Sequence, residues 1–451
     1  MTDFFTYQLV GADFLAANKV ALLADEMGLG KSAQAIRASD IVNAQSILVI
    51  CPAAVRINWA REFQRFSVFA PQCTVIGSKD KLSKFGVTVI SYDYMAKTAN
   101  KNKIKALHWD VVILDEAHYL KSAETKRTKS IYGADMKSGI KSTWLWMLSG
   151  TPAPNNVTEL WPHLAKANIT PLKYWEFTKH FTTGRQTDYG YIPLGTRNAE
   201  ELKTILNRFM LRRKKEDVMK DLPPIMFTDV AIERSPVELH PYFSADVEAA
   251  GDTPTFLSQI KKASEGLAQT LSALENATLT DVLSVLQGLE VSNATLRRYI
   301  GMAKVPTFAE IIRAELEEHP EMKIVIFAVH KSVIELLLKL FRCFSAVALY
   351  GETTPASRQI SIDRFQNEPQ TRVFIGNVKA AGTGITLTSA AEVAFIEASY
   401  NPADNAQAAM RCHRIGQKKP VRVRFFSCAN SSDELIMDAL RRKTAELAKI
   451  F

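Results

Sequence analysis

The chain has 451 residues, of which 47% are hydrophobic and 23% are charged, which is typical of a globular protein with two or three domains and excludes disordered and fibrous classes. It contains no run of about 18 apolar residues, and its five cysteines show neither metal-ligand nor disulfide-framework spacing, so neither a membrane span nor a metal cluster is predicted. The formal net charge of +9 suits a polyanionic partner, although many basic proteins bind none.

The first half of the chain alternates short β-branched runs with segments of helical spacing. The runs predict buried strands at 20–24, 46–52, 87–94, 111–118 and 142–151. Helical spacing lies between them, for example at 32–42 and 57–66. Strand, helix and strand repeated in this way predict a parallel sheet covered on both faces.

The alternation of strand and helix patterns stops after residue 152. A mixed segment of aromatic and turn residues leads to a helical run that ends in FMLRRKKEDVMKDLPP at 209–224, and residues 255–300 have helical spacing throughout. A second series of β-branched runs predicts strands at 323–329, 346–351, 372–378, 392–398 and 421–427. The sequence therefore predicts an α/β protein with two lobes.

The segment ADEMGLGKS at 24–32 joins the first predicted strand to a helix. The usual phosphate-loop pattern, G-x-x-x-x-G-K-[ST], would place a glycine where this chain has Asp25. The strand-to-helix context nevertheless turns backbone N–H groups and a helix N-terminus toward a bound anion. In this interpretation Lys31 reaches the outer phosphates and the Ser32 hydroxyl holds Mg²⁺. The alternative is a plain connection with a surface lysine.

A second motif, VVILDEAH at 111–118, decides between these interpretations. It places Asp115 and Glu116 at the end of a buried strand, and in open α/β sheets ligands bind at the carboxyl ends of strands. There Asp115 can hold the Mg²⁺ that bridges the phosphates, and Glu116 can orient and deprotonate the attacking water. The two motifs together predict a site that hydrolyses a nucleoside triphosphate.

Six segments, namely ADEMGLGKS, CPAAVRINWAREF, ISYDYM, LDEAH, MLSGTPAPN and HRIGQ, resemble the SNF2 family of DNA-dependent translocases within the superfamily 2 helicase-like ATPases. The segment GYIPLGTRNAEELKTILNRFMLRRKKEDVMKDLPP is similar to the branch that contains annealing helicases. The motifs occur in the family's order over nearly the whole chain. In this superfamily the loop begins with Ala24 and needs no leading glycine, which accounts for Asp25.

The resemblance implies a domain organisation and a ligand. It implies two RecA-like lobes with a helical insertion, at 1–205 for the first lobe, 206–304 for a brace with a helical protrusion, and 305–451 for the second lobe. It also implies ATP as the nucleotide, bound between the lobes with Mg²⁺. The residues that match its nucleotide contacts are Gln8 for the adenine, Gly28, Gly30, Lys31 and Ser32 in the loop, and Gly384 in the second lobe.

The resemblance also assigns residues that act with the phosphates. Arg411 and Arg414 match the arginines that reach the γ-phosphate, and with Gln407 they fall at i, i+4 and i+7, which predicts one helix face. The groups that match coupling between hydrolysis and lobe movement are His118, Ser149, Thr151 and Gln407.

Contacts with DNA are expected mainly along the phosphate backbone. The family matches for such contacts are Ser91, Tyr92, Lys331 and Thr386, although each could instead be an ordinary strand-end cap or surface residue. The basic run at 212–215 matches a brace between the lobes and could be packing or a DNA patch.

The sequence shows no zinc-ligand cluster or additional module, so we expect a minimal, monomeric motor core on double-stranded or forked DNA, with a repair, replication or restriction partner left open. The N-terminus lacks a signal peptide, which predicts a cytoplasmic protein of a bacterium or a virus's host cell, or a nuclear one if the source is eukaryotic. Two alternatives remain, a strand-separating DNA or RNA helicase and an ATP-switched nucleic-acid-binding scaffold.

Overall fold

The computed structural model describes residues 4–76, 85–187, 190–233, 243–273, 292–381, 385–428, 431 and 433. Their contacts divide the chain into two units, and the division falls between Asp221 and Leu222. The expected functional boundaries at 205 and 304 stay a prediction, and each unit is described below by itself.

The first unit contains a seven-stranded sheet in the order β3-β4-β2-β5-β6-β1-β9, and every neighbouring pair is parallel. Its strands are β1 (Val20–Leu23), β2 (Ser46–Cys51), β3 (Cys73–Val75), β4 (Gly86–Ser91), β5 (His108–Asp115), β6 (Lys141–Leu148) and β9 (Met210–Leu211). The five strands predicted for this half are present, which confirms the parallel sheet. The predicted strand 87–94 ends early, because the Ser91 side chain caps the helix that begins at Tyr92.

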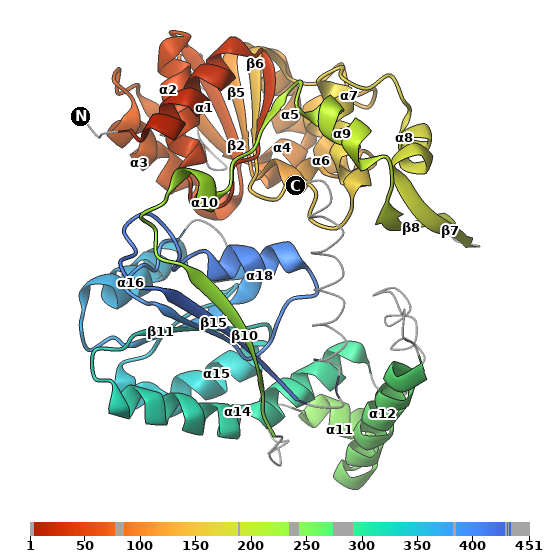
Figure 1. The fold of residues 1–451 in the computed structure, drawn as a ribbon, viewed down its shortest axis with the longest axis vertical. Coiled ribbons are helices and arrows are strands. Elements are labelled where there is room, and N and C mark those ends of the chain that lie inside the picture. The colour runs from red at the N-terminus through yellow and green to blue at the C-terminus, as the bar shows by residue number, and fades with distance from the viewer. Residues whose placement is uncertain are drawn as a thin grey trace. The chain divides into compact units, whose positions relative to one another are not determined.

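Helices cover both faces of this sheet (Figure 1). One face packs against α1 (Thr6–Ala17), α2 (Lys31–Ile41) and α3 (Arg56–Phe66). The other packs against α4 (Tyr92–Ala96), α5 (Thr98–Lys105), α6 (Lys126–Tyr132), α7 (Trp161–Lys166), α8 (Tyr174–Phe181) and α9 (Ala199–Leu206). Alternate residues of one strand serve the two cores: in β2, Val49 faces the first layer of helices and Leu48 the second, and both are fully buried. This explains why the strands are continuous apolar runs.

The second unit contains a six-stranded parallel sheet in the order β10-β15-β14-β11-β13-β12. Its strands are β10 (Ile225–Ala231), β11 (Ile324–Ala328), β12 (Val347–Leu349), β13 (Val373–Asn377), β14 (Glu392–Phe395) and β15 (Val421–Ser427). Its helices are α11 (Ser244–Ala250), α12 (Thr253–Ala273), α14 (Asn293–Glu318), α15 (Lys331–Leu340), α16 (Pro355–Asn367), α17 (Val378–Ala381) and α18 (Pro402–Ala409). The prediction of a second α/β lobe is confirmed.

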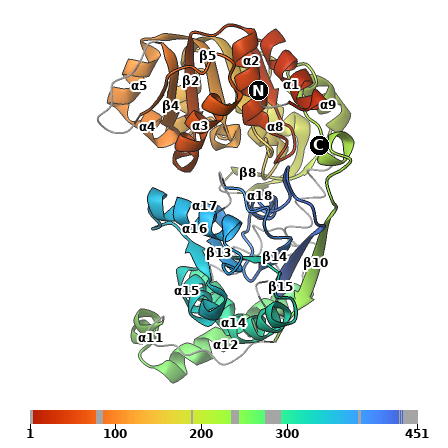
Figure 2. The same ribbon diagram turned by 90° about the vertical axis from the view of Figure 1, so that its left-hand side faces the viewer.

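The helical segment predicted at 255–300 is represented by α12 and the start of α14, and residues 274–291 lie outside the described ranges. Within the second unit, α11 and α12 lie beyond α14, away from the sheet (Figures 1 and 2). Phe243 and Phe256 nevertheless belong to the same apolar core as α14 and β11. These helices therefore extend the core of the unit.

Four strand features were not predicted, one of them the short edge strand β3, which pairs with β4. The hairpin β7 (Thr182–Thr187) with β8 (Gly190–Thr196) is antiparallel and separate from both sheets. The edge strand β10 is mostly exposed, with Phe227 at 54%, so its sequence lacks a buried apolar run. The short strand β9 pairs with β1 and precedes α10 (Lys215–Val218). Over the described ranges, no helix is long and apolar enough to cross a membrane.

The core of the second unit provides a test of this packing. Phe308 on α14 is fully buried and its ring meets Phe426 edge-on, with the ring centroids 4.8 Å apart. We expect Phe308→Ala to lower the free energy of unfolding of this unit by about 3–5 kcal/mol in urea titrations, because the cavity cannot fully collapse. Phe227→Ala, at an exposed position, should cost less than about 1 kcal/mol. Equal costs for the two variants would contradict this description of the core.

Candidate functional site

The loop between β1 and α2 has the backbone shape of a phosphate loop. Gly28 and Gly30 both have positive φ, 90° and 71°, which is the left-handed region that favours glycine. At Gly30 a side chain would also collide, because an added Cβ would lie 2.5 Å from Gln8 Nε2. Gly30 caps the 11-residue helix α2, so the loop leads directly into a helix N-terminus, where backbone N–H groups favour an anion.

Lys31 and Ser32 are the first two residues of α2. The Lys31 Nζ donates to the backbone oxygen of Asp25 at 2.7 Å and to that of Glu26 at 3.3 Å. Burial lowers the pKa of Lys31, and the carboxylates of Glu116, Asp25 and Asp115 oppose this effect. The lysine therefore lies in the electrostatic field of the carboxylates that follow β5.

Asp115 is the last residue of β5 and is held on several sides. Its Oδ2 accepts a hydrogen bond from Trp59 Nε1 at 2.8 Å, and its backbone oxygen accepts one from the Tyr92 hydroxyl at 2.7 Å. Burial, and then the adjacent Glu116 carboxylate, raise the pKa of Asp115 to about 7. A carboxylate with an apolar surrounding and a like charge beside it is typical of functional sites.

The residues predicted to couple hydrolysis to movement in the first unit lie together. Glu116 has a positive φ of 52°, and its Oε2 lies 3.3 Å from His118 Nδ1. The same His118 nitrogen is 3.2 Å from Ser149 Oγ, which accepts the backbone N–H of Thr151 at 3.2 Å. This chain of contacts joins the end of β5 to the turn after β6. The roles of its members stay predictions.

The sheet order explains why these distant motifs meet. Strand β6 pairs with β5 on one side and with β1 on the other, and all three run parallel. Their carboxyl ends therefore share one edge of the sheet, where ligands bind in open α/β folds. The turn after β6 lies against the phosphate loop, since a Cβ at Gly150 would be 2.6 Å from Met27 Cγ and 3.4 Å from Lys31 Nζ.

Gln8, the predicted adenine contact, is 5% exposed on α1. Its Oε1 accepts the Phe5 backbone N–H at 3.1 Å, and its Nε2 is 3.4 Å from the Leu29 backbone oxygen. Gln8 thus lies at the phosphate loop with an amide that can donate and accept.

In the second unit, the prediction that Gln407, Arg411 and Arg414 share one helix face is wrong, because α18 ends at Ala409. A turn follows, and the Arg411 backbone oxygen accepts the N–H of Leu387 at 2.9 Å, which ties that turn to another loop. Gln407 is buried within α18, at 8% exposure.

The two arginines lie in the turn after α18. Arg411 is 3% exposed, and its Nη1 is 3.4 Å from the Ile385 backbone oxygen. Arg414 donates to its neighbour Met410 and to the Thr386 hydroxyl, the latter at 3.3 Å. The structure thus brings Arg414 together with Thr386, and Gly384 lies outside the described residues.

The other predicted DNA contacts have defined roles within their own units. Ser91 is buried and its Oγ accepts the Tyr94 backbone N–H, so it is a strand-end cap. Tyr92 is 2% exposed and stacks on Tyr119, with ring centroids 5.3 Å apart. Lys331 begins α15 on the surface, and its ion pair with Glu352, at 2.6 Å, raises the pKa of the lysine.

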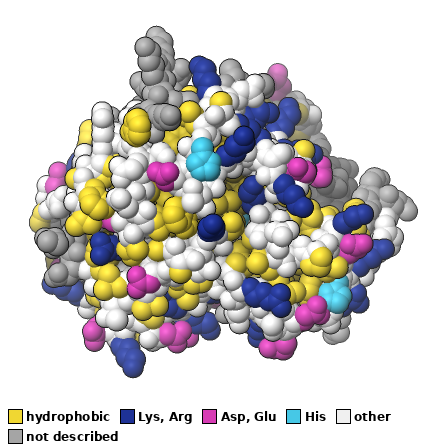
Figure 3. All heavy atoms as spheres, turned by 90° about the horizontal axis from the view of Figure 1, so that it is seen from above, with side chains coloured by type: hydrophobic (Ala, Val, Ile, Leu, Met, Phe, Trp, Pro, Cys, Tyr) yellow, Lys and Arg dark blue, Asp and Glu magenta, His cyan; other side chains and the backbone are white. Residues whose placement is uncertain are grey.

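The surface of the first unit shown in Figure 3 carries basic side chains spread among apolar, neutral and acidic ones. Among the described side chains on this face, the net positive charge of the chain is thus not gathered in one place. A phosphate-backbone path is not identified by this face.

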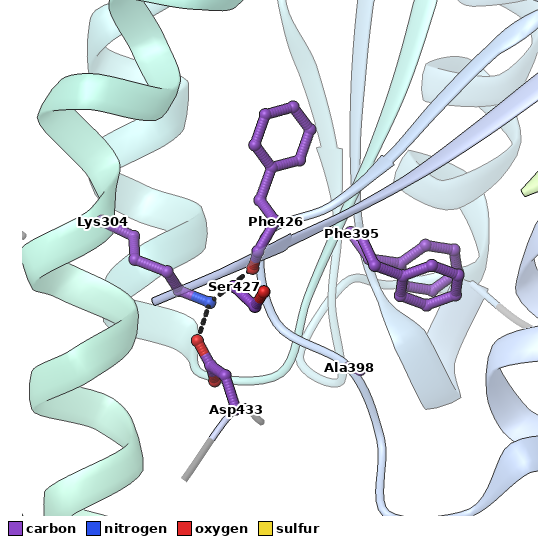
Figure 4. Close-up of a pocket in the computed structure, with 7 residues that line it drawn as sticks. Lys304, Phe395, Ala398, Phe426, Ser427 and Asp433 are labelled. Atoms are coloured by element: carbon purple, nitrogen blue, oxygen red, sulfur yellow. Dashed lines mark hydrogen bonds and ion pairs between the residues drawn. The ribbon is translucent and has the colours of Figure 1, made fainter. Parts of the chain in front are cut away.

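A small pocket in the second unit is structural rather than functional (Figure 4). Lys304 of α14 is 1% exposed, and its Nζ donates to the backbone oxygens of Ile396 and Phe426 and to Asp433 Oδ2, the last at 2.7 Å. An ammonium group has three donors, and all of them are used here. In the described part of the chain, no group of three or more His, Cys, Asp or Glu residues could hold a metal ion.

Comparison with models of protein families shows to which family this chain belongs. A model of the SNF2-related domain matches residues 7–290, and a model of the helicase conserved C-terminal domain matches residues 304–416. The chain belongs to the SNF2-related family. The resemblance inferred from the motifs is confirmed, and the two parallel sheets are the RecA-like lobes of this family.

Three curated relatives cover nearly the whole chain. The SWI/SNF-related matrix-associated actin-dependent regulator of chromatin subfamily A-like protein 1 of Drosophila melanogaster is 29% identical over 98% of this chain and 55% of its own. The ATP-dependent helicase fft1 of Schizosaccharomyces pombe is 28% identical over 96% of this chain and 51% of its own. The mouse DNA annealing helicase and endonuclease ZRANB3 is 26% identical over 94% of this chain and 38% of its own. The chain thus spans about half, or less than half, of the length of these three relatives.

Sequence reasoning missed one residue of the site. Trp59 lies in the quoted segment CPAAVRINWAREF, and its indole N–H binds the Asp115 carboxylate. The contact forms because α3 follows β2 and β2 pairs with β5. The sequence alone does not show this pairing, so the contact could not be predicted from it.

The raised pKa of Asp115 predicts a pH-dependent cost in stability. The unfolded chain ionises this carboxyl near pH 4, whereas the folded protein does so near pH 7. Metal-free protein should therefore lose stability between pH 4 and pH 7, because the unfolded state releases its proton first. We expect Asp115→Asn to raise the melting temperature in EDTA, with a gain that grows over this range, levels off above it and is worth on the order of a few kcal/mol.

The matched control is Asp93→Asn, at a carboxylate whose side chain is 75% exposed. The gain in melting temperature from Asp115→Asn over this range should exceed any change that Asp93→Asn produces. A gain from Asp115→Asn that is the same at pH 4 and pH 8 would refute the raised pKa of this carboxyl group.

Proposed function

We propose that this protein is a DNA-dependent ATPase that moves along or remodels duplex or forked DNA. The observation that carries the proposal is the meeting of three motifs at one sheet edge: the loop after β1, the carboxylates after β5 and the turn after β6. ATP is the proposed nucleotide, with Gln8 at the adenine and Lys31 at the outer phosphates. The ATP-dependent helicase and the DNA annealing helicase among the relatives support both the nucleotide and the nucleic acid.

Mg²⁺ fits the residues at this edge. The Asp115 carboxylate is partly buried beside Glu116, and its ionised form is disfavoured, so a nearby divalent cation would favour that ionised form. The Ser32 hydroxyl, at the start of α2, is the second proposed oxygen ligand. When bound, the ion would neutralise charge on the phosphates. Asp115 and Ser32 would hold the ion, while Lys31 would contribute a separate positive charge.

Glu116 is the proposed base. Its left-handed backbone turns the residue away from the regular path of β5, and His118 lies within reach of its carboxylate. Glu116 would accept a proton from the attacking water. His118 would position the Glu116 carboxylate and, through its contact with Ser149, would connect the protonation of Glu116 to the turn after β6. Arg411 and Arg414 are proposed to stabilise the transferring phosphoryl group, so hydrolysis would require a closed state of the motor.

DNA is proposed as the partner on the basis of family membership and charge. The net charge of +9 supports contact with a phosphate backbone, and Thr386 and Lys331 are the proposed exposed contacts. Because Lys331 is already paired with Glu352, binding a phosphate would require it to exchange partners. Duplex or forked DNA, a monomeric motor and a partner in repair, replication or restriction belong to the same proposal.

ATP hydrolysis without nucleic acid, and then with duplex, fork, single-stranded DNA and RNA, tests the proposal. We expect strong stimulation by duplex or fork, and a fall of about 10²–10⁴-fold in Glu116→Gln, because the base is lost while binding is kept. Glu124→Gln is the matched control, since that side chain is 87% exposed.

The outcomes separate the alternatives. Stimulation by single strands or RNA alone would favour a strand-separating helicase, to be checked by displacement on forked and tailed duplexes. Hydrolysis indifferent to every nucleic acid would count against the motor. If Glu116→Gln equals wild type both in its affinity for DNA and in its rate of ATP turnover, a scaffold that uses ATP as a switch would be favoured, because a scaffold needs no catalytic base.

A further inference from the structure

Residues 209–215 lie along the phosphate loop of the first unit. The pairing of β9 with β1 continues beyond the strand, because the Ala24 N–H donates to the Leu211 oxygen at 2.7 Å and the Glu26 N–H donates to the Arg213 oxygen at 2.9 Å. The backbone of the loop's first turn is thus hydrogen-bonded to a segment that lies far along the chain, since Asp25 and Arg213 are 188 positions apart.

The side chain of Arg213 connects three parts of the unit. Its Nε donates to Asp25 Oδ1 at 2.9 Å, and its Nη2 donates to Asp25 Oδ2 and, at 2.8 Å, to Gln34 Oε1. Its Nη1 donates to the Tyr7 backbone oxygen, and the guanidinium lies 5.4 Å from the centre of the Tyr7 ring. One arginine therefore binds α1, the phosphate loop and α2.

Gln34 carries the connection to the other end of the loop. Its Nε2 donates to Asp25 Oδ2 at 3.0 Å and to the Leu29 backbone oxygen at 3.1 Å. The fit is tight, because a Cβ at Gly11 would lie 1.8 Å from Gln34 Oε1. Asp25 at the first turn and Leu29 near the helix are thus fixed by one hydrogen-bonded cluster.

The cluster gives Asp25 a purpose that a glycine at this position could not serve. Asp25 has no exposed surface, and its ion pair is with Arg213, whose side chain is 14% exposed. A buried carboxylate without its cation is strongly disfavoured. The loop can therefore keep this shape only while the segment that carries Arg213 is seated on it.

We propose that Arg213 is a positioning residue for nucleotide binding, which acts through Asp25 and Gln34 on the phosphate loop. The segment that carries it continues to Leu222, where the second unit begins. Nucleotide binding and the seating of residues 209–215 are then linked, and by reciprocity each strengthens the other. This inference rests on the proposed function only in taking the loop as the nucleotide site.

The first test measures binding of a fluorescent ATP analogue, without DNA, to wild type, Arg213→Gln and Arg213→Lys. We expect Arg213→Gln to weaken binding by about 5- to 150-fold, the usual range of coupling between sites. Arg213→Lys should recover little of the loss, because an ammonium cannot make the paired contacts of a guanidinium. Arg208→Gln, at an exposed position just before this segment, is the matched control and should bind like wild type.

A double variant separates positioning from stability. Asp25→Asn with Arg213→Gln removes both charges, so no unpaired buried carboxylate remains, and its melting temperature should recover toward wild type. Its nucleotide affinity should stay low, because a glutamine at position 213 is too short to bind the side chain at position 25, Gln34 and the Tyr7 backbone together. Recovery of affinity in step with melting temperature would mean that Arg213 only stabilises the fold and would overturn the proposal.

Hydrogen exchange provides the second readout. The amides of Ala24 and Glu26 donate to the segment that carries Arg213, so the analogue should slow their exchange in wild type and not in Arg213→Gln. If Arg213→Gln binds the analogue as tightly as wild type and shows the same protection of these amides, the linkage would be overturned. A wild type that does not bind the analogue at all would instead refute the proposed function, so the two failures can be told apart.

Discussion

The parallel pairing of β5, β6 and β1 is the constraint on which the candidate site depends. Parallel strands end at the same edge of a sheet, so three segments far apart in sequence deliver their next residues to one place. The pairing holds because both faces of the sheet are buried under helices, with Val49 in one core and Leu48 in the other. Burial on both faces also sets the electrostatics, because the charges at the edge stand next to an apolar interior.

Those charges are arranged in partly compensating groups. Removal from solvent, and then repulsion by Glu116, raise the pKa of Asp115, while Lys31 lies near enough to favour the charged carboxylates. A partly buried like-charge pair is costly in isolation and becomes favourable beside cations, which is the condition that a metal-bound nucleotide would create. The same principle operates at Asp25, where the cation is Arg213 of the protein itself. The site thus combines one carboxylate that is already paired with others that favour a ligand.

Local patterns in the sequence predicted the loop, the carboxylates and ten of the thirteen strands of the two sheets, because buried parallel strands are short apolar runs. These patterns failed where the decisive contact joins residues far apart in the sequence, or where a strand is exposed to solvent. The Asp25–Arg213 pair joins residues 188 positions apart. The edge strand β10 is exposed and has no apolar run, and α18 ends at Ala409, after which the Arg411 oxygen in the following turn accepts from a neighbouring loop. Family resemblance, and not periodicity, identified Gln8 and the two arginines.

The central claim is that hydrolysis at this sheet edge drives movement along duplex DNA. Displacement of a third strand from a DNA triplex tests it most directly, because a motor that tracks the duplex must remove the strand in its path without separating the duplex itself. We expect displacement that needs hydrolysable ATP and is absent with a non-hydrolysable analogue. Rapid DNA-stimulated hydrolysis that leaves the triplex intact would contradict it.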